Sequence, residues 1–193
     1  MRQVLAGKRI AILVTDGFRL EELTEPRQAL EGAGARADIV SPAQGKVKGW
    51  KETAWEGEFE VDVPLDSADA ADYDGLLLPG GVMNPDKLRR NEKALKFVRG
   101  FFSAGKPVAA ICHGPWTLID AGVVKGRRMT SYESIQSDLK NAGAIWSDEE
   151  VVVDQGLVTS RKPSDLPAFN RKMIEEFAEG VHGGQKRDPA FAG

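Results

Sequence analysis

The chain has 193 residues, of which 41% are hydrophobic and 28% are charged, and its formal net charge is −3. This composition is typical of a globular protein, and the length predicts a single domain over residues 1–193. A slightly acidic chain without a stripe of Lys and Arg lacks the charge that neutralises phosphates, so we expect no nucleic-acid partner. The N-terminus has no signal-peptide pattern and no apolar run approaches the length of a membrane span, which predicts a cytoplasmic protein without membrane association.

Short apolar runs alternate with helical patterns along the first two thirds of the chain. Residues 8–14 form a β-branched apolar run that is typical of a buried parallel strand. Leucines from Leu20 to Leu30 then recur at helical spacing, and Gly32 is a typical helix stop. In chain order, the pattern further predicts a strand at 36–40, a small hairpin around 59–63, a strand at 74–78, a helix at 91–104, a strand at 107–111 and a helix at 115–121.

The last third repeats this alternation with shorter elements. Its pattern predicts a short strand at 129–131, a helix at 133–141, strands at 144–146, 150–153 and 157–160, and a final helix at 164–178. The core is therefore expected to span about 8–178. The Gly-rich residues 180–193 are predicted to form a mobile tail.

Strands that alternate with helices predict an α/β fold with a mostly parallel sheet, because parallel crossovers need helices on both faces. In such sheets, sites form beyond the carboxyl ends of the strands. Three turns are expected to meet at that edge, namely residues 16–22, 79–86 and 112–115.

The single cysteine, Cys112, cannot form an internal disulfide, so it is either an inert buried side chain or a reactive group. It lies directly between the predicted strand 107–111 and the helix that begins at Pro115, and Gly114 permits a sharp turn of the nucleophile-elbow kind. A thiol at a helix N-terminus faces free N–H groups and the positive end of the dipole. This placement favours the thiolate and predicts a lowered pKa for Cys112.

The chain has two histidines, His113 and His182, and His182 lies in the predicted tail. A Cys–His mechanism must therefore use His113, whose ring would need an orienting carboxylate on its second nitrogen. Asp86 is a candidate because it follows the turn after the strand 74–78, although an Asp at this place also suits a helix N-cap.

Glu22 belongs to the first turn that meets this edge, so a carboxyl group is expected near Cys112. A protonated Glu could donate to the thiolate or act as acid and base for a substrate. The alternative is an exposed charge that complements the dipole of its helix, and Glu21 fits that role better.

The pair Gly80 and Gly81 follows the strand 74–78, and its backbone, with the N–H groups after Cys112, is a candidate to hold an oxyanion. The pair is no dinucleotide fingerprint, and the chain contains no P-loop, so we expect no cofactor. One cysteine and two distant histidines form no ligand cluster at zinc spacing, so we expect no metal.

Three motifs stand in a fixed order: LLLPGG at 76–81, AICHGP at 110–115 and TSRKPSDLP at 159–167. With the intervening sequence, they make the chain resemble the PfpI-type intracellular protease family of the class I glutamine amidotransferase-like superfamily over about residues 8–178.

The resemblance implies a flavodoxin-like three-layer sandwich with a nucleophile at Cys112, a neighbouring His113 and a carboxyl group at Glu22 that contacts the thiol. It also implies an acid after the glycine pair that reaches the histidine of an adjacent subunit, and hence a homodimer or a larger assembly such as three dimers. The matching residue is Asp86, where the family usually has the longer Glu. Residues 17–20 depart from a more acidic run in relatives.

The leading function implied by the resemblance is a stress-response deglycase or glyoxalase that acts without a cofactor on glyoxals or on early glycation adducts of proteins and nucleotides. A second is a cysteine peptidase of the PfpI type, with Cys112 as nucleophile, His113 as base and Asp86 as orienter. A third is a redox-sensing or chaperone-like stress protein in which Glu22 stabilises oxidised Cys112.

Overall fold

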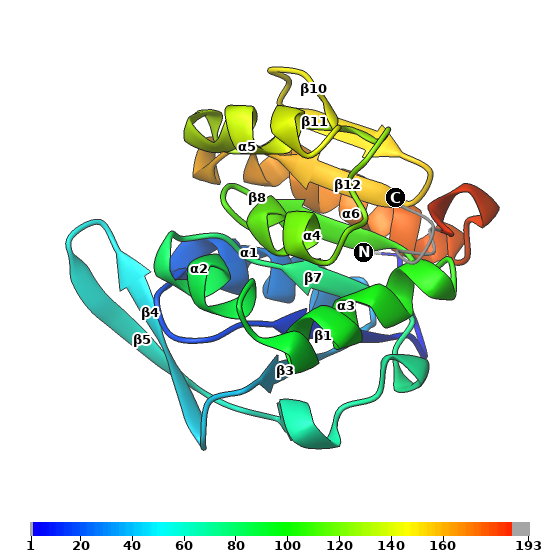
Figure 1. Ribbon diagram of the computed structural model, residues 1–193. Helices are drawn as coiled ribbons and strands as arrows, with labels where there is room; N and C mark the ends of the chain where they lie inside the picture. Colours follow the sequence, from blue (N-terminus) through cyan, green and yellow to red (C-terminus); the bar gives the residue numbers. More distant parts are fainter. Residues whose placement is uncertain (1, 187–193) are drawn as a thin grey trace.

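A mostly parallel sheet forms the middle layer of the protein (Figure 1). In this computed structural model, which describes residues 2–186, seven strands follow the order β11-β12-β8-β7-β1-β3-β6, and β11 alone among them runs antiparallel to its neighbour. The strands are β1 (Arg9–Leu13), β3 (Arg36–Ser41), β6 (Val63–Pro64), β7 (Gly75–Leu78), β8 (Val108–Ile111), β11 (Val151–Asp154) and β12 (Leu157–Ser160).

Helices cover both faces of this sheet (Figure 1). One face packs against α1 (Leu20–Gly32) and α6 (Leu166–Glu179). The opposite side carries α2 (Met83–Leu88), α3 (Glu92–Ser103), α4 (Pro115–Asp120) and α5 (Gln136–Asn141). These three layers confirm the predicted α/β class and the flavodoxin-like sandwich.

The central strands are apolar along their whole length because both of their faces are buried. In β1, Ile10 and Ile12 pack into the core under α1 and α6, whereas Ala11 and Leu13 pack into the core under α3 and α4. All four side chains are fully buried. Alternate residues of a strand point to opposite faces, so an uninterrupted apolar run is what a doubly covered strand requires.

Two smaller sheets flank the main one. A three-stranded sheet contains β2 (Phe18–Arg19), β4 (Lys46–Lys51) and β5 (Ala54–Glu60), and a two-stranded sheet pairs β9 (Arg128–Met129) with β10 (Ile145–Trp146). The β4–β5 hairpin extends away from the body as an arm (Figure 1). The hairpin predicted around 59–63 therefore forms earlier in the chain, because Val63 pairs with Val40 of the main sheet.

Short 3-10 helices complete the connections: η1 (Leu65–Ser67), η2 (Ala70–Asp72), η3 (Glu133–Ile135), η4 (Pro163–Asp165) and η5 (Gly183–Gln185). Helix η5 lies in the predicted mobile tail, and it shows that this part of the tail is ordered. Gln185 is fully buried, and its side-chain Nε2 donates to the Lys106 carbonyl at 3.2 Å. Residues 187–193 of that tail lie outside the described residues. Within 2–186, no helix combines the length and apolarity that a membrane span needs.

Candidate active site

Cys112 lies on a sharp turn between β8 and α4, at the carboxyl edge of the parallel sheet. Its φ of 61° is in the left-handed region that residues other than Gly rarely adopt, so the turn stores backbone strain. Two hydrogen bonds hold it, from the Cys112 N–H to the Ser160 carbonyl at 3.0 Å and from the Tyr132 N–H to the Cys112 carbonyl at 2.9 Å. This strained backbone turn, held by two hydrogen bonds, has the geometry of the predicted nucleophile elbow.

Two glycines make room for this turn. A Cβ on Gly114 would lie 2.6 Å from the Leu78 carbonyl oxygen, and a Cβ on Gly80 would lie 2.7 Å from the Cys112 Cβ and overlap the Glu22 carboxyl group. Both contacts are closer than real Cβ atoms reach. Glycine is therefore required where the backbones of β7 and β8 approach the thiol.

The carboxyl group of Glu22 is buried beside this thiol. Glu22 is the third residue of α1 and is 0% exposed, and its Oε2 accepts the Gly80 N–H at 2.8 Å. Burial raises its pKa from 4.5 to about 8, although its contacts with Gly80 and the Cys112 thiol oppose this shift. The carboxyl group is therefore mainly protonated at neutral pH, and the alternative of an exposed first-turn charge is wrong.

Burial also acts on the thiol itself. It raises the pKa of Cys112 well above the ordinary value, and the adjacent Glu22 adds to the increase. The N–H groups of Gly81 and His113 point to the sulfur and favour the thiolate, but they do not outweigh burial. The predicted lowering of this pKa is thus reversed, because the helix dipole is a smaller effect than the removal of a charge from water.

His113 stands between the thiol and a serine. Its Nδ1 lies 3.2 Å from the Cys112 Sγ and its Nε2 lies 3.2 Å from the Ser134 Oγ. The ring stacks on Tyr132 at 5.0 Å between centroids and meets the edge of Trp116 at 5.1 Å. Burial lowers the pKa of His113, so the imidazole is neutral at neutral pH, with one ring nitrogen as donor and the other as acceptor.

Asp86 does not meet His113 within the chain. It lies in the first turn of α2, its side chain is exposed, and it forms no hydrogen bond with His113 in the described structure. The N-cap of α2 is Val82, so Asp86 is not a cap either. The predicted contact depends on a second subunit and stays a prediction.

The backbone N–H groups of Gly80 and Gly81 have different partners. The Gly80 N–H is bonded to Glu22, so it is not free for an oxyanion as expected, whereas the Gly81 N–H faces the sulfur. Gly81 and His113 therefore supply the two backbone donors nearest to the reacting atom. Of the predicted oxyanion donors, Gly81 and the N–H after Cys112 therefore remain candidates, whereas Gly80 does not.

Two residues of this region were not predicted. Ser134 follows β9, and its place at the same sheet edge was the available signal. Asn84 is fully buried and ties two turns together: its Oδ1 accepts the Thr15 N–H at 2.8 Å and its Nδ2 donates to the Pro79 carbonyl at 3.0 Å. An Asn before a Pro reads as an ordinary turn residue, so the sequence held no clear signal for it.

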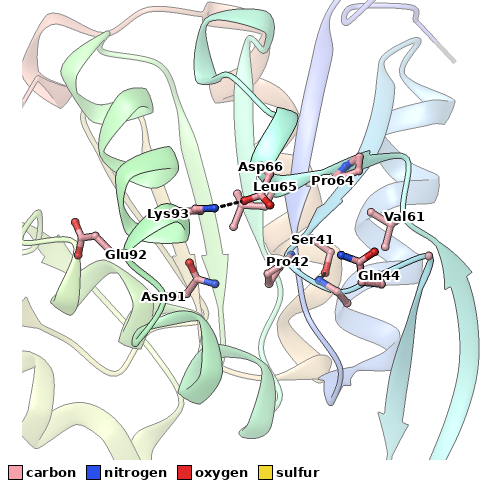
Figure 2. Close-up of a pocket in the computed structure, with 12 residues that line it drawn as sticks. Ser41, Pro42, Gln44, Val61, Pro64, Leu65, Asp66, Asn91, Glu92 and Lys93 are labelled. Atoms are coloured by element: carbon pink, nitrogen blue, oxygen red, sulfur yellow. Dashed lines mark hydrogen bonds and ion pairs between the residues drawn. The ribbon is translucent and has the colours of Figure 1, made fainter.

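A separate cavity of about 480 Å³ lies at the carboxyl end of β3 (Figure 2). Ser41, Asn91 and Lys93 line it, and Lys93 Nζ pairs with Asp66 at 2.6 Å. Because β3 lies three strands from β8, the ends of these two strands are about 14 Å apart, and the cavity is separate from the Cys112 elbow. It contains none of the predicted site residues.

Comparison with family models places residues 8–176 in the DJ-1/PfpI family. Two curated bacterial proteins are similar over most of their length. Protein/nucleic acid deglycase 2 of Escherichia coli is 47% identical over 170 residues, which cover 87% of this chain and 96% of that protein. The putative cysteine protease YraA of Bacillus subtilis is 45% identical over 169 residues, which cover 87% and 97%.

A solved structure is also similar to this chain. It is a two-domain protein from Anabaena variabilis with DJ-1/ThiJ/PfpI-like and ferritin-like domains, and it matches with a TM-score of 0.84 at 34% identity. The match covers 95% of this chain and 51% of that chain.

Proposed function

Because the chain belongs to the DJ-1/PfpI family, we propose that it is a cysteine-dependent deglycase or glyoxalase-like hydrolase. Its substrates would be glyoxals or early glycation adducts of proteins and nucleotides, and the name of the Escherichia coli relative supports this class. One observation carries the proposal: the buried Glu22, with a pKa of about 8, lies against the Cys112 thiol. Such a group can both give and take a proton near neutral pH.

The first step is addition of the thiol to an aldehyde carbon. The S–H proton passes to the carbonyl oxygen, one S–C bond forms, and the product is a hemithioacetal. Because the resting thiol is protonated, it needs an acceptor for its proton, and the neutral His113 ring lies 3.2 Å away. The N–H groups of Gly81 and His113 would stabilise negative charge as it develops.

The second step is a proton shift between adjacent carbons. Glu22, in its ionised form, would remove the proton from the carbon bonded to sulfur and return it to the neighbouring carbon. The hydroxyl proton moves at the same time from the hemithioacetal oxygen to the former 2-oxo oxygen. The hemithioacetal of a 2-oxoaldehyde thereby becomes the thioester of a 2-hydroxy acid, with no net change in protons. Water then hydrolyses the thioester, which releases the acid and restores the Cys112 thiol.

The roles of the two acids can be separated by comparing Glu22→Gln with Asp86→Asn. Loss of a positioned acid or base costs about 10²–10⁴-fold in rate, so methylglyoxal turnover should collapse in Glu22→Gln. It should stay within about tenfold of wild type in Asp86→Asn, because carbonyl addition has no leaving amine to protonate. Lactate release is the measurement, and Cys112→Ala is the inactive control. Retained turnover in Glu22→Gln would contradict the proposal.

A cysteine peptidase is the second candidate, and the name of the Bacillus subtilis relative favours it. It would use Cys112 as nucleophile and His113 as base, with the Asp86 of a second subunit as orienter. Peptide cleavage that falls in Asp86→Asn while Glu22→Gln keeps its methylglyoxal turnover would support this alternative. The homodimer and the cytoplasmic location stay predictions.

A further inference from the structure

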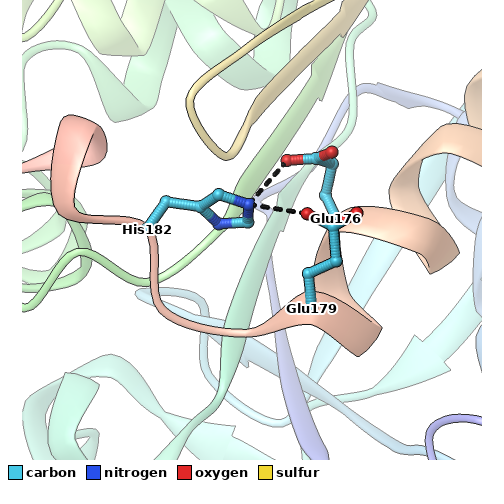
Figure 3. A group of neighbouring side chains, drawn as sticks. All are labelled: Glu176, Glu179 and His182. Atoms are coloured by element: carbon cyan, nitrogen blue, oxygen red, sulfur yellow. Dashed lines mark hydrogen bonds and ion pairs between the residues drawn. The ribbon is translucent and has the colours of Figure 1, made fainter.

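Three side chains with metal-binding atoms converge at the C-terminal end of α6 (Figure 3). They follow a Glu-x-x-Glu-x-x-His pattern in Glu176, Glu179 and His182. The His182 Nε2 lies 2.9 Å from Glu179 Oε2 and 3.2 Å from Glu176 Oε2, and the three donor atoms lie within 4.8 Å of one another. The cluster contacts the loops that precede β8 and β12, so it lies at the opposite edge of the sheet from Cys112.

The ring of His182 is held in one orientation. Its Nδ1 lies 2.8 Å from the Gly180 carbonyl oxygen, which only accepts, so Nδ1 carries a proton. The His182 backbone N–H donates to the Gly105 carbonyl at 2.8 Å, and Gly156 packs against the ring where a Cβ would lie 3.0 Å from Nδ1. A ligating histidine typically donates its other ring N–H to a carbonyl in this way. The nitrogen that faces the two carboxylates is therefore Nε2.

In the neutral ring, Nε2 is an acceptor, and it faces two further acceptors. Nε2 lies 2.9 and 3.2 Å from the two oxygens, and such a group of lone-pair atoms is stable only with a proton or a cation between them. A proton on His182 would leave one net negative charge, whereas a divalent ion bound to the neutral ring would leave none. Within residues 2–186, neither carboxylate pairs with Lys or Arg, and Glu176 is only 8% exposed.

We propose that Glu176, Glu179 and His182 bind a divalent transition-metal ion of the zinc class. Ligands 2.0–2.1 Å from a tetrahedral ion lie about 3.3 Å apart, close to the separations from Nε2 to the two oxygens. An imidazole in the ligand set favours zinc over magnesium or calcium. The expectation of no metal considered only cysteines and histidines, whereas this proposal adds two carboxylates that lie one turn apart on α6.

The site would fasten the end of the described chain to α6. Residues 183–185 form η5, and Gln185 is fully buried against the loop before β8. A metal ion held by α6 and His182 would cross-link this segment to the sheet edge and stabilise the folded state in proportion to its occupancy.

Zinc titration of the metal-free, full-length protein tests the proposal. Calorimetry with ZnCl₂ should show one site per chain in the Cys112→Ser background, which removes the active-site thiol as a ligand. Glu179→Gln and His182→Asn should each weaken that site at least tenfold. Glu175→Gln is the matched control, because it removes the same charge from an exposed neighbour on α6 that pairs with Lys172. MgCl₂ should not compete.

Cobalt substitution provides a second readout. Co²⁺ should give a visible spectrum of nitrogen and oxygen ligands in the same background, and zinc should displace it. Stoichiometric binding that Glu179→Gln leaves unchanged would overturn the proposal, as would the absence of binding. A His182 ring that remains doubly protonated by NMR in excess zinc would show that a proton occupies the cluster, and this also overturns it.

Discussion

Two groups that share one buried space determine the reactivity of Cys112. Its thiol and the Glu22 carboxyl group both have raised pKa values, because burial disfavours each charged form and two adjacent charges would repel. The resting site therefore holds protons on both groups at neutral pH. Reaction begins from a neutral thiol whose proton must leave as the S–C bond forms.

Alkylation of Cys112 should follow this raised pKa. We expect the iodoacetamide rate to rise through pH 9 without a plateau, since the thiolate fraction is still increasing there. Glu22→Gln removes the adjacent charge, so its rate should be higher at pH 8 and its plateau should come at lower pH. Intact-mass spectrometry measures both profiles, because the chain has one cysteine. A wild-type plateau below pH 8.5 would contradict the direction of this shift.

Ionisation of Glu22 should also lower the free energy of unfolding as the pH rises. Its pKa is about 8 when folded and 4.5 when free, so the folded state binds the proton more tightly. The stability that the protonated Glu22 contributes is fully present below pH 4.5. Between pH 4.5 and pH 8, the free energy of unfolding falls by about 1.4 kcal/mol per pH unit. Glu22→Gln keeps an acceptor for the Gly80 N–H but does not ionise. Urea unfolding from pH 5 to 8 should show the variant gaining on the wild type as the pH rises. A constant difference would argue against a buried, titrating Glu22.

The positions of the central strands could be predicted, because a strand that is buried on both faces is an uninterrupted run of apolar residues. The run at 157–160 predicts β12 to the residue, and 107–111 predicts β8 within one residue. The six-residue helix α2 was missed because Pro85 and a short polar stretch read as a loop. The elbow at Cys112 was predictable from its flanking strand and Gly114. Ser134 and Asn84 were not predicted, because the His113 and Thr15 that they bond lie 21 and 69 residues away in the chain.

Gly114 sets the geometry of the elbow, so Gly114→Ala should distort it. The added Cβ would lie 2.6 Å from the Leu78 carbonyl oxygen and 2.9 Å from that of Ile111, and these backbone atoms cannot move independently. We expect a loss of about 1–3 kcal/mol in the free energy of unfolding. Gly183→Ala is the control, since its Cβ would meet no atom within 4 Å. Equal stability of the two variants in urea would show that the turn tolerates the contact.

At the scale of the whole molecule, two groups are candidates to orient the ring of His113. Within the chain, Ser134 bonds its Nε2, while Asp86 faces outward. Val82 is 54% exposed, and its carbonyl accepts the Asp86 N–H at 3.2 Å, so both residues lie on the same face of α2. If a second subunit brings its own acid to His113, the exposed surface around Asp86, which includes Val82, is the part of α2 that it would cover.

Val82→Asp should therefore separate the subunits without unfolding the chain, because Val82 is exposed and a negative charge is tolerated at the start of a helix. If the partner's Asp86 orients His113, the monomer should lose at least tenfold in peptide cleavage, where the imidazole must protonate a leaving amine. Methylglyoxal turnover, which depends on Glu22 of the same chain, should stay within about tenfold. Sedimentation velocity establishes the assembly, and Val4→Asp is a control at another exposed apolar residue. Full peptide cleavage by a verified monomer would assign the orienting role to Ser134 instead.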